Sequence, residues 1–189
     1  MMKNYASENV FFHYFALTLH SDMRKITVSD EKLRLAATQG SDAFVGVFND
    51  ALLAAIDGTL TADNMCELNA DQPTLIGWYW LHEEVMDGGF IQLIHNGYGP
   101  FFFRNPFAAA VAEWGLDDLS KLINKVRRLY FKYGKEIEAD CSDDEFMSLF
   151  ERYPDFDDAD DTFVDKEELW TAKIAYYIDE NIEKFAIIE

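Results

Sequence analysis

The residues best suited to acid–base chemistry are His82, Glu83 and Glu84, which follow one another in an otherwise apolar stretch. His82-Glu83 begins like the zinc-protease pattern HExxH, but Met86 stands where the second histidine must be. The chain also lacks a phosphate-binding glycine loop and a G-x-S-x-G sequence. We therefore expect a non-catalytic protein with no cofactor and no metal. An enzyme or metal protein centred on His82, Glu84 and His95 is the alternative.

A second candidate for metal chemistry is the acidic stretch 157–168. If Asp157 is the first residue of a twelve-residue calcium loop, oxygen ligands fall at positions 5, 9 and 12, namely Asp161, Asp165 and Glu168. Position 3 is Ala159 and position 6, which is normally glycine, is Thr162, so the pattern fails where it is strict. Loose binding of divalent cations to the carboxylates of 155–168 stays open.

The overall charge restricts the partners of the protein. The 189 residues include 35 Asp and Glu against 16 Lys and Arg, a formal net charge of -19, with 49% hydrophobic residues. Such a chain can fold around a core, but its charge disfavours contact with nucleic acid or an anionic membrane. Cys66 and Cys141 lack a CxxC pattern and indicate two reduced thiols. We expect a cytoplasmic protein, in which residues 4–20 belong to the mature chain and favour a helix over a strand.

The negative charge is concentrated in the last third of the chain. Residues 1–97 have a net charge of -8, residues 98–135 of +4, and residues 136–189 of -15. One interpretation is a solvated acidic face, partly neutralised by the basic residues between Lys121 and Lys135, which would serve solubility alone. The other is mimicry of DNA phosphates by carboxylates held on rigid helices. That interpretation predicts these partner-binding residues: Asp143, Asp144, Asp155, Asp157, Asp158, Asp160, Asp161, Asp165, Glu167 and Glu168.

The spacing of apolar residues predicts an all-α, single compact domain of about eight helices. It comprises an N-terminal appendage (1–40), a helical core (41–135) and an acidic helical part (136–189). Apolar residues on every side of 73–86 predict a buried central helix, which Gly88-Gly89 ends in a corner before a second helix begins. The apolar stretch 98–103 and the polar stretch 155–164 are predicted as loops, and 165–185 as the last helix.

The residues around this corner carry a resemblance. Their order is Glu84, Asp87-Gly88-Gly89-Phe90, Gln92, Asn96 and Gly99. It resembles the signature of a bacterial domain family of mostly unknown function, whose best understood members are small acidic DNA-mimic proteins; the similarity extends over about 44–185. The resemblance implies an all-helical fold and binding to a basic DNA-binding protein, a helix-turn-helix type transcription regulator, in place of its DNA. We interpret the matched residues as structural, with Glu84 bonding exposed amides of the second helix and the Gln92 and Asn96 amides bonding backbone groups.

Overall fold

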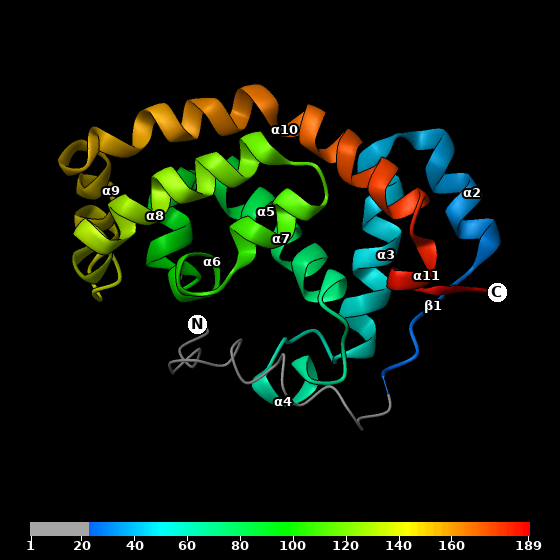
Figure 1. The fold of residues 1–189 in the computed structure, drawn as a ribbon. Coiled ribbons are helices and arrows are strands. Elements are labelled where there is room, and N and C mark those ends of the chain that lie inside the picture. The colour runs from blue at the N-terminus through cyan, green and yellow to red at the C-terminus, as the bar shows by residue number, and fades with distance from the viewer. Residues whose placement is uncertain (1–22) are drawn as a thin grey trace. The chain divides into compact units, whose positions relative to one another are not determined.

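Residues 23–189 are described by a computed structural model, so the helix expected over 4–20 lies outside the described residues. Helices make up most of the described chain, which confirms the all-α class (Figure 1). The α-helices are α2 (Asp30–Gln39), α3 (Ser41–Ala55), α4 (Ala62–Met65), α5 (Asp71–His95), α6 (Gly99–Arg104), α7 (Phe107–Glu113), α8 (Asp117–Ile137), α9 (Asp143–Arg152), α10 (Asp157–Asp179) and α11 (Ile182–Phe185). No helix among these residues is long and apolar enough to cross a membrane.

The described residues group into two compact units. We call residues 80–167 the central unit, and residues 23–79 with 168–189 the terminal unit. Helices α5 and α10 contribute residues to both units. The predicted single domain with a separate N-terminal appendage and acidic part stays a prediction.

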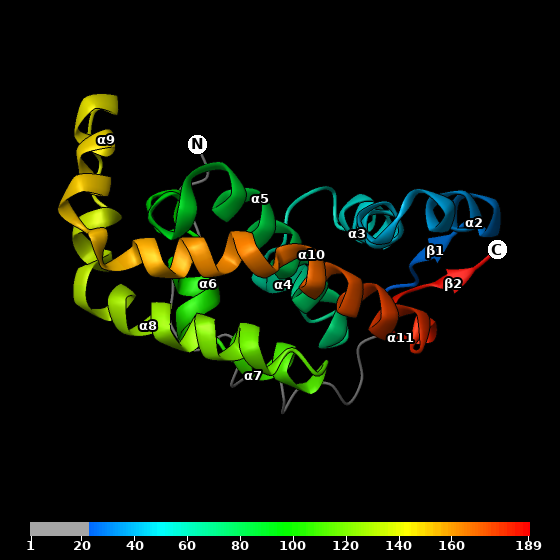
Figure 2. The ribbon, with the colours of Figure 1, turned by 90° about the horizontal axis from the view of Figure 1, so that it is seen from above.

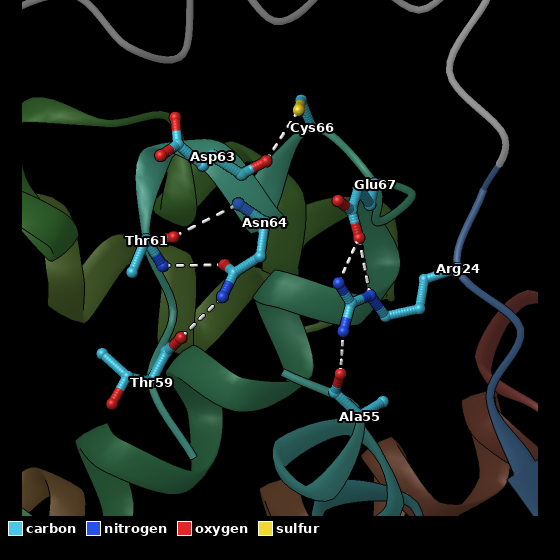
Figure 3. Close-up of polar contacts among 8 residues, drawn as sticks. All are labelled: Arg24, Ala55, Thr59, Thr61, Asp63, Asn64, Cys66 and Glu67. Carbon is cyan, nitrogen blue, oxygen red and sulfur yellow. Dashed lines mark hydrogen bonds and ion pairs between the residues drawn. The ribbon is translucent and has the colours of Figure 1, made fainter. Parts of the chain in front are cut away.

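The terminal unit joins the two ends of the described chain. Strand β1 (Thr27–Val28) pairs in parallel with β2 (Ile187–Ile188), a ladder that the sequence did not predict because each strand has only two residues. The Arg24 guanidinium reaches both the Glu67 carboxylate and the Ala55 carbonyl oxygen (Figure 3). The rings of Phe48 and Phe185, both fully buried, meet edge-on at 6.2 Å between centroids.

Local capping explains where several helices begin. Thr61 and Asn64 form a reciprocal capping box at the start of α4 (Figure 3), and Ser29 accepts a bond from the Lys32 backbone N–H at the start of α2. At α5, the Asn69 side-chain oxygen accepts bonds from the backbone N–H groups of Asp71 and Gln72 at 2.9 and 3.1 Å. Each cap satisfies N–H groups that have no partner inside the helix.

The central unit is built around the predicted Gly-Gly corner. The backbone leaves helical geometry at Gly88 (φ -152, ψ 27) and Gly89 (φ 68, ψ -174), which confirms that this pair separates two helical segments of α5. Phe90, Leu93 and Ile94 follow the corner and are fully buried. The corner therefore brings two apolar helical segments into the core.

Two segments predicted as loops are helical. Phe102 and Phe103 are buried inside α6, where Pro100 occupies the first turn. Similarly, Pro154 begins a 3₁₀ turn, η1 (Pro154–Phe156), and α10 follows directly from Asp157, so the last long helix starts eight residues earlier than expected. Proline and aspartate both favour the first turn of a helix, and the prediction took them as a helix stop and a polar loop.

Candidate protein-binding surface

Helix α9 and the part of α10 that lies in the central unit carry most of the predicted carboxylates. Helix α9 is fixed at its start by Ser142, whose side chain accepts a bond from the Glu145 N–H while the Glu145 side chain accepts one from the Ser142 N–H. Ser142 and Glu145 thus form a reciprocal capping box. Asp143 and Asp144 lie in the first turn, exposed to solvent. The Ser142 N–H and the Ser142 hydroxyl donate to the Glu145 carboxylate at 2.8 and 2.9 Å, and these two bonds hold the pKa of Glu145 below its ordinary value.

The exposed carboxylates of α10 share one face of the helix. Each residue of an α-helix is rotated by about 100° around the helix axis from the one before it, and on this geometry five exposed carboxylates fall within a sector of roughly 100° around the axis of α10. Four lie in the central unit, namely Asp157, Asp158, Asp161 and Asp165, and the fifth is Glu168, where the same helix continues into the terminal unit. Ala159 and Phe163, both fully buried, lie on the opposite side of the helix. We call the five exposed side chains the acidic row.

The charge density of the acidic row is close to that of a DNA strand. At a rise of about 1.5 Å per residue, the row covers about 17 Å, or roughly one carboxylate every 4 Å. One strand of duplex DNA carries about one phosphate per 3.4 Å of axis. Because the carboxylates are held on a helix, a partner meets this field without first ordering the chain.

Two of the ten predicted partner-binding residues point elsewhere. Asp160 and Glu167 are partly buried, and each has a partner on α5. An Asp160 oxygen accepts the backbone N–H of Phe90 at 2.8 Å, and a Glu167 oxygen lies 3.0 Å from Nε2 of His82. The other eight residues are exposed. Sequence reasoning could have separated these two by helix periodicity, since both fall away from the sector of the acidic row.

Asp160 has an unusual environment for a carboxylate. The pKa of Asp160 is raised to about 6, chiefly by burial and further by the charges of Asp157 and Asp161, while the hydrogen bond from the Phe90 N–H acts in the opposite direction. Its ionised form is therefore held in the fold at a cost.

Basic residues of α8 neutralise a small part of the acidic surface. Lys125 lies 3.9 Å from Asp158, and Lys132 lies 3.4 Å from Asp155. The Tyr133 hydroxyl donates to Asp155 at 2.6 Å, and this bond, followed by that of Lys132, holds the pKa of Asp155 below its ordinary value. Within residues 23–189 no ion pair joins a basic side chain to Asp143, Asp144, Asp157, Asp161, Asp165 or Glu168. The central unit (residues 80–167) has 20 acidic and 9 basic residues, a net charge of -11.

The residues of the alternative catalytic or metal centre each have a separate partner. His82 contacts Glu167, and Nδ1 of His95 lies 2.8 Å from the Ile137 carbonyl oxygen. Glu84 accepts the side-chain amides of Gln92 and Asn96 at 3.2 and 2.7 Å. Across the described residues, no three His, Cys, Asp or Glu side chains are grouped to hold a metal ion.

The structure decides two further points of the sequence analysis. The stretch compared with a calcium loop, a pattern that already failed at Ala159 and Thr162, is part of helix α10. At the corner, Glu84 bonds side-chain amides, and the Gln92 amide also donates to Asp87 at 2.8 Å. The side-chain amides of Gln92 and Asn96 thus bond carboxylates and not backbone groups. The backbone N–H of Phe90 donates to Asp160, a contact that sequence reasoning missed because the two residues are 70 positions apart in the chain.

Known proteins are similar to the part of the chain that contains the corner and the acidic row. The family of DMP19-like proteins matches residues 66–181. A curated protein from Neisseria meningitidis serogroup B (strain ATCC BAA-335 / MC58), named DNA mimic protein DMP19, is 37% identical over 123 residues, which cover 64% of this chain and 74% of that protein. The matched range includes the Gly-Gly corner and the acidic row. This chain belongs to the DMP19-like protein family.

Proposed function

We propose that this protein is a DNA mimic, which binds the DNA-binding surface of a basic regulator and so keeps it from DNA. The observation that carries the proposal is the acidic row, with carboxylates at nearly the spacing of strand phosphates on one face of α10. Its relative from Neisseria meningitidis is named a DNA mimic protein. The protein has no catalytic role in this proposal and acts in the cytoplasm.

We further propose that the partner is a transcription regulator of the helix-turn-helix type. In such regulators a recognition helix enters the major groove of DNA while basic side chains hold the flanking phosphates. The acidic row would occupy the phosphate-binding side chains. The exposed Asp143, Asp144 and Asp155 extend the negative surface beyond α10.

The test has two steps. The immobilised protein is used to capture partners from the source cell at about 50 mM and about 300 mM salt, because an interaction that replaces phosphate contacts weakens steeply with salt. The captured protein is then bound to a labelled DNA duplex, and this protein is titrated in. Loss of duplex binding in proportion to the amount added supports the proposal, and a ternary complex with DNA contradicts it.

A matched pair of variants ties the result to the acidic row. The test variant neutralises the row with Asp157→Asn, Asp158→Asn, Asp161→Asn, Asp165→Asn and Glu168→Gln. The control changes the same number of exposed acids in the terminal unit, with Asp42→Asn, Asp50→Asn, Asp57→Asn, Asp63→Asn and Glu180→Gln. Both alter the net charge equally, so only the position of the charges differs. We expect at least about tenfold weaker competition from the test variant and a much smaller change from the control.

A further inference from the structure

The Gly-Gly corner is shaped around the side chain of Asp160. The Asp160 carboxylate accepts the Phe90 N–H at 2.8 Å. A Cβ atom on Gly89 would lie 2.6 Å from one carboxylate oxygen of Asp160 and 2.8 Å from its Cγ and its other oxygen. Glycine at position 89 therefore leaves the space that the carboxylate fills.

The backbone of Gly89 sets a second requirement for glycine. Its φ of 68 and ψ of -174 fall in a region that is nearly restricted to glycine. The corner thus depends on glycine both for its own conformation and for the approach of α10. Either requirement alone would explain a glycine here, but only the close approach of Asp160 concerns the acidic helix.

Three contacts join this part of α5 to α10 inside the central unit. The contacts come from three residues on one side of α10. Asp160 accepts the Phe90 N–H, and the ring of Phe163 lies 6.1 Å from the ring of Phe90 between centroids. Glu167 contacts a ring nitrogen of His82. Because Asp160 pairs with Phe90 and the later Glu167 pairs with the earlier His82, these segments of α10 and α5 run in opposite directions. Figure 2 shows α10 passing across α5 in this part of the molecule. The acidic row lies on the side of α10 away from these contacts.

We propose that the Gly88-Gly89-Phe90 corner is the docking point that holds the acidic helix in place, with Asp160 as its positioning residue. The inference rests on the proposed function, because what Asp160 positions is the proposed binding surface. A fixed row binds a rigid basic surface more tightly than a fraying one, since less ordering entropy is lost on binding. In this proposal the signature residues of the corner serve the surface indirectly, through Asp160.

The first test needs no partner and uses the whole chain. Amide hydrogen exchange is measured by NMR for the wild type, Asp160→Ala and Asp160→Asn. Alanine removes the acceptor of the Phe90 N–H, so we expect at least about tenfold faster exchange at Phe90 and faster exchange over residues 157–166. Asparagine keeps an acceptor oxygen and should restore protection at both places. Unchanged protection of residues 157–166 in a folded Asp160→Ala protein would overturn the proposal.

The wild type provides a check that does not depend on whether Asp160→Ala folds. If the corner holds the helix, the Phe90 amide and the amides of 157–166 exchange in one common opening with similar protection. Independent exchange of the two segments would overturn the proposal.

The second test connects the corner to binding. Competition against labelled duplex for the captured regulator should be about three- to tenfold weaker for Asp160→Ala and near wild type for Asp160→Asn. Equal competition by the alanine variant would overturn the functional part of this inference. If wild type fails to compete while the exchange result holds, the proposed function is wrong and the docking of the helix stands.

Discussion

Replacing Asp160 by asparagine should stabilise the protein near neutral pH. The folded state holds this carboxyl with a pKa of about 6, against an ordinary value of 3.8. A group whose pKa is raised on folding is ionised at a cost, so its contribution to stability is greatest at low pH and is lost as pH rises from about 4 to above about 6. At about 1.36 kcal/mol per pKa unit, the cost at neutral pH is at most about 3 kcal/mol. Asparagine removes the charge and retains an oxygen that can accept the Phe90 N–H.

The assay is chemical denaturation of both proteins at a series of pH values. We expect Asp160→Asn to exceed the wild type by about 1 to 3 kcal/mol in free energy of unfolding at about pH 7.5, with the difference shrinking towards about pH 4. Comparing the two proteins at each pH cancels the titration of the other carboxylates. An asparagine variant that is less stable at pH near 7.5, or a difference that does not vary with pH, would refute the reasoning.

Three further substitutions test other parts of the account. Asn49 in α3 is fully buried, and neither polar atom of its side chain has a hydrogen-bond partner in the described structure. Asn49→Leu should therefore raise the free energy of unfolding by about 1 to 2 kcal/mol, and a decrease in this free energy would contradict the expectation. Ser142→Ala should cost about 1 kcal/mol in the same assay, because the hydroxyl that caps the helix is lost. The pKa of Glu145, followed by NMR, should rise only part of the way to its ordinary value, because the backbone N–H of residue 142 still donates to the carboxylate. Gly89→Ala should lower the free energy of unfolding by about 2 to 5 kcal/mol, because the new methyl group strains the backbone and overlaps with Asp160. Gly97→Ala is the control: Gly97 also has a positive φ but has open space around it, so its substitution should cost about 1 kcal/mol. Equal losses for the two variants would argue against the contact with Asp160.

The sequence predicts the features of this fold that depend on local rules. Capping pairs such as Ser142 with Glu145 and the stop at Gly88-Gly89 could be read from a few neighbouring residues. The segments around Pro100 and Pro154 were mistaken because proline marks both the end of one helix and the first turn of the next. The two-residue strands β1 and β2 leave no periodic signal at all.

The candidate surface could be predicted in composition but not in detail. Counting charges located the acidic third of the chain, and helix geometry explains why Asp161 faces outward. That Asp160 turns inward could be suspected from periodicity, but its partner could not be named. The Phe90 N–H lies 70 residues earlier, and only tertiary packing brings the two together.

The salt dependence of competition with DNA is the most direct test of whether the acidic row replaces DNA phosphates. The captured regulator, a labelled duplex and this protein are combined at a series of salt concentrations between about 50 and 300 mM. We expect the protein to displace the duplex and its own affinity for the regulator to fall steeply as salt increases. Neutralising the acidic row should flatten this dependence more than the matched control does. Displacement that is insensitive to salt, or equally sensitive in both variants, would contradict the claim that these carboxylates stand in for phosphates.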